Sequence, residues 1–401
     1  MRQTRFFLLL CGFILMGAPS ADAGTARSVA LGGDGAYFLD SANVLQWYAS
    51  LERYPDRLVL EPGDVVHNKD RALSAMGWLG HGGGAHVRLN GTGNAGTVAF
   101  YFQDHLDKAD DDGAFALLYS RRLGAWRLGV AGRFTTFGKF RAVSGGDIVV
   151  DGQYFHTYGL GLGRRLNDVW EAELAGEIIN TMTDFPHTAG GVSSDTWKSY
   201  GLRLRLRGRL GEDLTLVPVL SRTRRQGGYY SDLLGDPADQ DAAVTTLGLG
   251  VNLYRPDGAL IIISGEYRRG SQNWALREGS TQEAVWDASA QDFHQIRGRL
   301  GLESDLMECL TVRMAAQYLR HHEEIERKAF AATGEGLDDK ESILNISVAT
   351  PLSLGLAWRH GPLTVDLTYN DTAALNPGLA GEGLMMGNRE GYSVVTITRK
   401  F

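Results

Sequence analysis

The chain has 401 residues and a formal net charge of −7, from 40 lysines and arginines against 47 aspartates and glutamates. An acidic chain of this kind is not expected to bind nucleic acid, which is recognised through basic patches. The two cysteines, Cys11 and Cys309, allow no disulfide framework, because Cys11 lies in a predicted export signal.

Residues 1–23 have the pattern of a signal peptide. Arg2 and Arg5 precede an apolar run over residues 6–16, and Ala21-Asp22-Ala23 supplies the small residues that signal peptidase requires. The apolar run is shorter than the about 20 residues of a transmembrane helix. We expect the chain to be exported and residues 1–23 to be removed.

Residues 24–56 differ in character from the rest of the chain. The cluster Asp40-Ser41-Ala42-Asn43 can cap a short helix that runs to about Tyr54 and ends at Pro55. A helix that precedes the first strand of a barrel can lie inside the barrel or beneath it. We therefore predict that residues 24–56 form a helical plug segment.

Residues 57–401 show the two-residue alternation of β-strands, and the stretch 201–210 shows it most clearly. Leu202, Leu204 and Leu206 fall on one face of a strand there, and four arginines fall on the other. A soluble β-sandwich would have to bury those arginines at high cost, whereas a water-filled lumen can hold them. The pattern therefore predicts a transmembrane β-barrel, with apolar residues facing lipid and charges facing the lumen.

The connections between the predicted strands alternate in length. Short turns near residues 121–125, 166–168, 211–213, 256–258, 304–306 and 361–362 alternate with long connections. The long ones cover residues 104–112, 141–151, 183–195, 227–241, 272–289, 323–341 and 372–389. Outer-membrane barrels have short periplasmic turns and long external loops, so this alternation favours a bacterial outer-membrane location.

The strand count follows from the same pattern. Fourteen strands are predicted from residue 96 onward, at 96–104, 113–121, 125–139, 152–164, 168–181, 196–209, 213–226, 242–254, 258–270, 290–302, 308–321, 342–359, 362–371 and 390–401. Two earlier candidates, 57–61 and 84–90, would raise the number to sixteen, which we favour slightly. The predicted fold class is an all-β, antiparallel up-and-down transmembrane barrel of 14–16 strands with a short N-terminal helical plug.

The predicted final strand ends on an aromatic residue. Val395, Ile397 and Phe401 share one face, which resembles the C-terminal signal by which the barrel-assembly machinery recognises outer-membrane proteins. Arg399 departs from that pattern, but charge costs little near an interface. The resemblance implies the assembly machinery, outer-membrane lipid and lipopolysaccharide as partners, against the alternative of an ordinary terminal strand in a soluble protein.

Charged residues predicted to line the lumen are the main candidates for a binding site. They are Glu171, Glu173, Glu177, Arg203, Arg205, Arg207, Arg209, Arg297, Arg299 and Arg313. Neighbouring antiparallel strands would place the glutamates opposite the first arginines. Two interpretations remain open: a polar path or binding surface for a solute, and a structural ion ladder, which we favour.

Metal and enzyme chemistry receive little support from the sequence. The aspartates of residues 104–112 lack the spacing of a calcium loop, and the histidines lack His-x-x-x-His spacing, although His321-His322 precedes Glu323-Glu324. A hydrolase would need a nucleophile beside a base such as His156 or His294, and no serine is singled out. We predict no metal, no cofactor and no enzymatic activity.

Aromatic residues cluster where predicted strands would meet an interface. They are Tyr101, Phe102, Phe134, Phe137, Tyr154, Phe155, Tyr229 and Tyr230. As a set, they predict an aromatic girdle at the membrane surface, although each alone could belong to a core.

Three stretches after the signal resemble the start of FadL-like and PorV-like outer-membrane proteins. They are Ala30-Leu31-Gly32-Gly33, Asp40-Ser41-Ala42-Asn43 and Trp47-Tyr48-Ala49-Ser50-Leu51. The family has Asn-Pro where this chain has Trp47-Tyr48. The resemblance implies that the N-terminal segment plugs the lumen, and that the protein either passes hydrophobic compounds sideways into the membrane or acts in protein secretion. No substrate-contacting residue can be transferred from so short a match.

These observations favour a porin-like transport protein for small solutes, hydrophobic or amphiphilic. The alternative is a barrel that transports nothing and serves as a scaffold, secretion partner or adhesin. A barrel hydrolase is the least favoured hypothesis.

Overall fold

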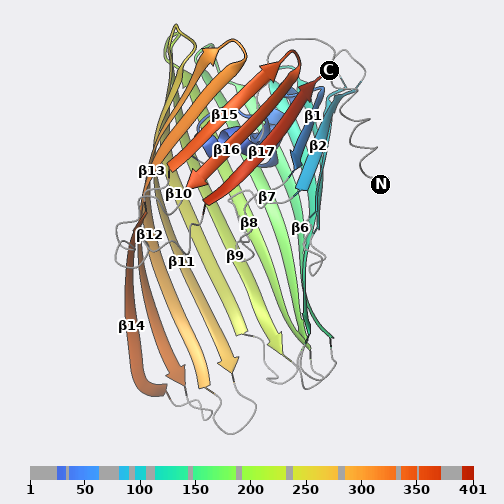
Figure 1. Cartoon of the computed structure of the whole chain (residues 1–401). Coiled ribbons are helices and arrows are strands. Elements are labelled where there is room, and N and C mark those ends of the chain that lie inside the picture. Colours follow the sequence, from blue (N-terminus) through green and yellow to red (C-terminus); the bar gives the residue numbers. More distant parts are fainter. Residues whose placement is uncertain are drawn as a thin grey trace.

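A closed antiparallel β-barrel dominates the computed structural model (Figure 1). The structure describes residues 25–32, 36–62, 81–89, 95–104, 113–142, 148–186, 192–231, 238–278, 285–330, 336–349, 352–371 and 391–401. The predicted signal peptide and most of the long external loops, including residues 105–112 and 372–390, lie outside the described residues.

Seventeen described strand segments occupy sixteen positions in the wall, because β14 and β15 both pair with β13. The predicted single strand 342–359 therefore corresponds to two segments. In chain order the segments are β1 (Arg57–Pro62), β2 (His81–Arg88), β3 (Thr97–Asp104), β4 (Gly113–Leu123), β5 (Trp126–Ala142), β6 (Ile148–Arg165), β7 (Trp170–Pro186), β8 (Val192–Arg209), β9 (Leu214–Ser231), β10 (Ala238–Tyr254), β11 (Leu260–Glu278), β12 (Val285–Met307), β13 (Leu310–Phe330), β14 (Gly336–Ala349), β15 (Leu352–His360), β16 (Leu363–Asp371) and β17 (Gly391–Lys400).

The barrel closes through β1, which lies between β2 and the last strand, β17. Arg57 of β1 is the register partner of Lys400 in β17 on one side and of His86 in β2 on the other. The early strand candidates at 57–61 and 84–90 therefore belong to the wall. The prediction of a transmembrane-type barrel is confirmed, with sixteen strands and not fourteen.

The two ends of the barrel differ in their connections. Gly124, Gly211, Gly258 and Gly361 have positive φ in the tight turns at one end, where a residue with a Cβ would be strained. The C-terminus lies at this end, at the top of Figure 1. By the rule that short turns face the periplasm, this is the periplasmic end and the opposite end is external.

The wall is much taller on one side than on the other (Figure 1). Strands β6 to β13 have 17–23 residues, whereas β1 to β3 have 6–8 and β15 to β17 have 9–10. Since about 9–11 residues span a bilayer, the long strands continue well beyond the membrane on the external side.

This extension corrects several predicted loop boundaries. Strands extend into five of the predicted loops and cover about half or more of each. These loops are 141–151, 183–195, 227–241, 272–289 and 323–341. Beyond the membrane both faces of a strand can meet water, so the apolar alternation that marks a lipid-facing strand disappears from the sequence there.

The outer face of the barrel is apolar, as the alternation predicts. Leu202, Leu247 and Leu300 are 53–54% exposed, while Arg205 and Arg299, which point inward, are at most 7% exposed. Exposed leucines on a closed sheet whose interior holds the charges are suited to a lipid environment and not to water. The protein is a transmembrane β-barrel of the bacterial outer-membrane type. Among the described residues, none of the helices is long and apolar enough to cross a membrane.

The predicted aromatic girdle is wrong in part. Phe102 and Phe134 are exposed on the outer face, but Tyr101 points inward, is only 8% exposed and contacts His86. Consecutive residues of a strand face opposite sides, so Tyr101 and Phe102 cannot both meet lipid. Phe155 shares the inward face with buried Thr157. The side chains of Phe137, Tyr154, Tyr229 and Tyr230 lie outside the described residues.

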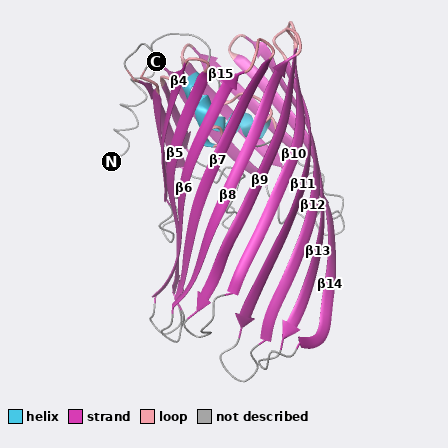
Figure 2. Cartoon of the chain, turned by 180° about the vertical axis from the view of Figure 1, so that it is seen from behind, coloured by secondary structure: helices cyan, strands magenta, loops and turns pink. Residues whose placement is uncertain are grey.

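Three short helices lie inside the barrel near its periplasmic end (Figure 2). They are α2 (Thr25–Ala30), η1 (Ser41–Leu45) and η2 (Tyr48–Arg53), so the single helix expected from Asp40 to Tyr54 is two 3-10 turns. Asn43 donates its side-chain N–H to the Phe38 carbonyl at 2.7 Å, which fixes the chain before η1. We call residues 25–56 the plug.

The largest apolar core lies between the plug and the wall. Val44, Trp47, Tyr48 and Leu51 of the plug pack against small or aliphatic wall residues. Those wall residues are Ala99, Ala116, Leu118 and Ala175. The plug thus fills a lumen that the wall residues alone leave open.

A charge placed on the lipid face should destabilise the barrel according to its depth. Leu249→Arg lies midway in the outward apolar row of β10 and should cost about 2–4 kcal/mol, whereas Thr245→Arg, on the same face beyond that row, should cost about 0–1 kcal/mol. Equilibrium unfolding in lipid vesicles measures both, and equal costs would contradict the assigned membrane position.

Candidate functional site: a plug held in the lumen

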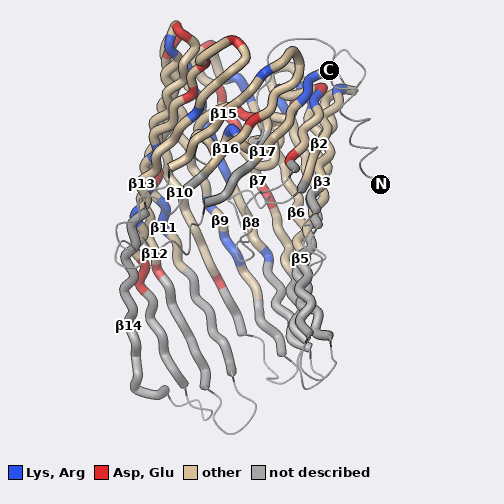
Figure 3. The backbone as a smooth tube through the Cα atoms, viewed as in Figure 1, with Lys and Arg blue, Asp and Glu red and all other residues tan. Residues whose placement is uncertain are grey.

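The inward faces of β7 and β8 form a ladder of opposite charges. Glu173 is the register partner of Arg205, and Glu171 of Arg207. Arg205 Nη2 lies 2.6 Å from Glu173 Oε2, and Arg207 Nη1 lies 3.8 Å from Glu171 Oε2. Figure 3 shows acidic positions along β7 and basic positions along β8. The structure thus brings together the carboxylates and arginines that the sequence placed on neighbouring strands.

Each glutamate of this ladder also holds one residue of the plug. The Tyr48 hydroxyl donates to Glu177 at 3.1 Å, and the Ser50 hydroxyl donates to Glu173 at 2.7 Å. Arg53 forms an ion pair with Glu171. Burial, together with the carboxylate of Glu177, raises the pKa of Tyr48 above its usual value, so its hydroxyl remains protonated as a donor.

The wall supplies its own cation to each of the same glutamates. Arg203 pairs with Glu177, Arg205 with Glu173, and both Arg127 and Arg207 contact Glu171. All three carboxylates are therefore neutralised from the wall, while the plug adds a hydroxyl donor to Glu173 and to Glu177 and a cation to Glu171. Removing the plug would still leave every one of them with an arginine.

Arg205 is the most enclosed of these cations, with no exposed side-chain surface. Besides Glu173, it donates to the Ala36 carbonyl at 3.1 Å and to the Ser50 hydroxyl at 3.4 Å. Its guanidinium also lies 4.3 Å from the centre of the Trp47 ring, within the range of a cation–π contact. One wall residue thereby contacts three separate parts of the plug.

A second set of contacts holds the start of the plug against the opposite wall. Arg27 binds Glu303 with two hydrogen bonds of 2.7 and 2.8 Å, in a bidentate arrangement. Arg313 also binds Glu303, at 2.5 Å, and pairs with Asp366. The Thr368 hydroxyl donates to the Ala26 carbonyl at 2.7 Å. Arg313 thus neutralises two wall carboxylates beside the plug.

The third anchor surrounds Tyr37 of the plug. Its hydroxyl donates to Glu266 at 3.2 Å, and Asn252 donates to its carbonyl at 2.8 Å. Arg297 and Arg299 lie 3.9 and 3.8 Å from Glu266. These two predicted lumen arginines therefore flank a carboxylate that contacts the plug.

Glycines in the wall make room for the two plug tyrosines. A Cβ at Gly159 would collide with the Tyr48 ring, and one at Gly248 would collide with the Tyr37 hydroxyl. Gly161 and Gly250 are similarly close to the same two tyrosines. The wall is therefore shaped to receive the plug as well as charged to bind it.

On the external side of the Tyr37 anchor, β11, β12 and β13 present one more inward polar row. Arg268, Gln295 and His321 are register partners across the three strands. Arg268 Nε, Gln295 Oε1 and His321 Nδ1 are each buried without a hydrogen-bond partner among the described residues. We call these three residues the lumen row.

An aromatic ring and a carboxylate adjoin the lumen row. The Phe293 ring centre lies 5.9 Å from the Arg268 guanidinium and 5.7 Å from the His321 ring centre. Glu323 lies 4.0 Å from His321 Nε2, on the far side of the row from Arg268. The row thus offers hydrogen-bonding groups beside an apolar surface, with its cationic end at Arg268.

The remaining sequence candidates do not join these clusters. Arg209 is exposed at the periplasmic end of β8. His156 and His294 are exposed and share the outward face with Phe134 and Arg269, so neither can act as a base within the lumen. His321 and His322 are consecutive on β13 and face opposite sides of the wall. In the described part of the chain, no group of three metal-ligating side chains occurs.

Sequence reasoning missed the plug partners and three wall carboxylates. Glu266 is the single acidic residue of the predicted strand 258–270, and Glu303 falls just outside the predicted strand 290–302. Asp366 shares the predicted strand 362–371 with Asp371, whereas the three glutamates of β7 stood out as a set. The signal that could have found two of them is strand alternation, because Glu266 and Glu303 are the register partners of the predicted lumen arginines Arg297 and Arg313. Asp366 has Ala357 as its partner on β15, so no neighbouring arginine marks it.

No protein-family model matches this chain, and no curated protein matches it in sequence. Among solved structures, the toluene transporter TodX of Pseudomonas putida is 12% identical with a TM-score of 0.46, covering 96% of this chain and 100% of TodX. CdiB from Acinetobacter baumannii is 10% identical with a TM-score of 0.46, over 86% of this chain and 60% of CdiB.

The translocator domain of the autotransporter NalP from Neisseria meningitidis is 13% identical with a TM-score of 0.36, over 70% of this chain and 90% of that domain. The FadL-like and PorV-like resemblance of the N-terminal segment stays a prediction from the sequence. Similarity at this level concerns the barrel fold alone and carries no argument about activity. What the structure shows is an outer-membrane type of barrel whose periplasmic half is occupied by its own N-terminal segment.

Proposed function

We propose that this protein carries small anionic or amphiphilic solutes across the outer membrane, with the plug as its gate. The observation that carries the proposal is the lumen row, whose buried polar atoms neither the plug nor the described wall uses. Buried polar atoms normally find partners, so an unused set facing a lumen favours a ligand.

The chemistry of the lumen row favours a carboxylate joined to an apolar body. The guanidinium of Arg268 suits an anionic head, and the Gln295 amide and His321 imidazole can add hydrogen bonds. The Phe293 ring offers an apolar surface beside them. A hydrocarbon without a polar group fits poorly, because it would have to displace water from ion pairs without replacing the lost hydrogen bonds.

The contacts of the plug favour reversible release. Three plug side chains bind β7, but Glu171, Glu173 and Glu177 each keep a wall arginine when the plug leaves. No wall carboxylate would then be stranded without a cation, which is the most costly outcome for a buried pair.

The alternative is a scaffold that never opens, in which the plug stays in the periplasmic half of the lumen. Both proposals agree with the closed arrangement. They differ in whether solute passes once the plug is displaced, and the following variants test this difference.

Removing a plug anchor should open the channel. Glu173→Ala deletes the acceptor of Ser50 and leaves the enclosed Arg205 without a carboxylate, which should weaken plug docking by about 3–5 kcal/mol. We expect more and longer open events in planar bilayers than in the unaltered protein.

The matched control is Asp168→Ala, which breaks a surface pair with Arg165 in which the aspartate side chain is 98% exposed. Such a pair contributes about 0–1 kcal/mol, so conductance should not change. If the Glu173→Ala plug became accessible to trypsin in a folded barrel and no current or solute flux appeared, the scaffold would be favoured.

Displacing the plug without altering charge should have the same effect. A leucine at Gly248 would occupy the space of the Tyr37 hydroxyl and break its bond to Glu266. Gly265→Leu is the control on the neighbouring strand, because nothing lies within 4 Å of a Cβ there. We expect raised conductance for Gly248→Leu only. Raised conductance in both variants would point to a general loosening of the wall.

The lumen row should set affinity for the solute. Arg268→Gln should weaken binding of 4-phenylbutyrate, a carboxylate with an aromatic body, by roughly tenfold to a hundredfold, since a hydrogen bond to a charged group contributes about 1.5–3 kcal/mol. Isothermal titration measures this affinity in the Glu173→Ala barrel with and without the Arg268→Gln change. Arg165→Gln, at an exposed periplasmic turn, makes the same charge change and should have no effect. Equal losses of affinity in the Arg268→Gln and Arg165→Gln variants would contradict a role of the lumen row in solute binding.

A further inference from the structure

The outward face changes from apolar to polar at one level on eight neighbouring strands. On each strand from β6 to β13, an exposed apolar or tyrosine residue is followed, two positions toward the external end, by a polar one. The pairs are Tyr158 and His156, Ile178 and Asn180, Tyr200 and Lys198, Leu220 and Arg222, Leu247 and Thr245, Tyr267 and Arg269, Ile296 and His294, and Tyr318 and Arg320.

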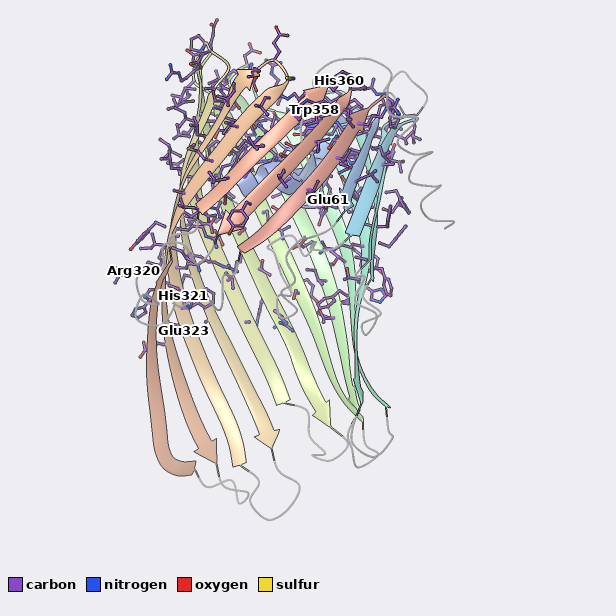
Figure 4. The ribbon with its side chains drawn as sticks, viewed as in Figure 1. Glu61, Arg320, His321, Glu323, Trp358 and His360 are labelled. Carbon is purple, nitrogen blue, oxygen red and sulfur yellow. The ribbon has the colours of Figure 1, made fainter. Side chains whose placement is uncertain are left out.

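The register places these first polar residues in two main rows of the sheet, which are four residues apart where β8 meets β9, because Lys198 is the partner of Gln226. Arg222, Thr245, Arg269 and His294 are successive register partners across β9 to β12. Arg320 is the partner of Ile296, the outward residue next to His294. Figure 4 shows Arg320 projecting away from the barrel wall. The level therefore marks the external limit of the lipid-facing belt on the tall side of the barrel.

The charge at this level has one sign. Lys198, Arg222, Arg269 and Arg320 are cations, His156 and His294 carry imidazoles, and none of the eight residues is acidic. We call these six residues the basic collar. Four tyrosines lie directly on its membrane side, as expected where a barrel meets the lipid headgroups.

The collar cations differ from the arginines that anchor the plug inside the barrel. In the part of the chain that the structure describes, no carboxylate lies within ion-pair distance of Lys198, Arg222, Arg269 or Arg320. Inside the barrel each anchor arginine has a carboxylate, and one row further out Arg224 is paired with Asp241 at 2.9 Å. Among the described residues, the protein thus leaves these four cations without a carboxylate at the height of the external headgroups.

We propose that the basic collar binds the phosphate groups of lipopolysaccharide in the outer leaflet. The collar lies on the long-loop side, which faces the outside of the cell, and lipopolysaccharide is the phosphate-bearing lipid of that leaflet. Arg222 and Arg269 are two strands apart, about 10 Å, so a glycolipid carrying two phosphates can contact both. This inference does not depend on whether the barrel transports solutes.

The test compares two triple variants with the same change in charge. Arg222→Gln/Arg269→Gln/Arg320→Gln removes three collar cations, and Arg122→Gln/Arg165→Gln/Arg255→Gln removes three exposed cations from periplasmic turns. Binding of bis-phosphorylated lipid A to each purified full-length barrel is measured by native mass spectrometry in detergent. Heat-modifiable migration on gels verifies that each barrel is folded.

Each collar cation should contribute about fivefold to lipid A binding, so the collar variant should bind about a hundredfold more weakly, and the periplasmic variant should bind like the unaltered protein. Equal losses in the two variants, or no loss in the collar variant, would overturn the proposal. Equal binding of phosphatidylglycerol by the unaltered protein would also overturn it, because the collar would then be a general anion surface.

A gain-of-function variant keeps the test decisive if the collar variant folds poorly. Thr245→Arg adds a cation at a neutral position between Arg222 and Arg269. It should tighten lipid A binding about fivefold. Unchanged or weaker binding in the folded Thr245→Arg barrel would count against the collar.

Discussion

The ion pair between Arg205 and Glu173 is the interaction on which the interior of this barrel depends. A guanidinium with no exposed surface is tolerated only with a carboxylate at hydrogen-bond distance, and Glu173 lies 2.6 Å away. The pair exists because the register of β7 and β8 places the two residues opposite one another. The same guanidinium contacts Trp47, Ser50 and Ala36, so the position of the plug follows from the register of the wall.

Shape and charge act together in holding the plug. The glycines at 159 and 248 admit tyrosine side chains close to the wall backbone, and the hydroxyls of those tyrosines reach Glu177 and Glu266. A larger wall residue would hold the rings too far away to form these bonds. Since each of these carboxylates also has a wall arginine nearby, the plug is bound specifically but is not required for the electrostatic balance of the wall.

The barrel and its lumen charges could be predicted from sequence because both produce a local period of two. Leu202 faces lipid and Arg203 faces the lumen, as the alternation indicates. The plug contacts could not be predicted, since they join residues such as Arg27 and Glu303 that are far apart in the chain and carry no shared pattern. The external ends of the long strands were missed because water on both faces leaves no alternation to detect.

Arg268 and Arg269 illustrate how one strand serves two environments. They are consecutive, so the pleat sends Arg268 into the lumen beside Phe293 and Arg269 outward beyond Tyr267. An insertion or deletion of one residue in β11 would exchange their environments and those of every residue that follows. The solute proposal and the lipopolysaccharide proposal therefore rest on the same register but on opposite faces. A substitution of Arg268 can therefore alter solute binding in the lumen without altering the collar, and a substitution of Arg269 can alter lipid binding by the collar without altering the lumen.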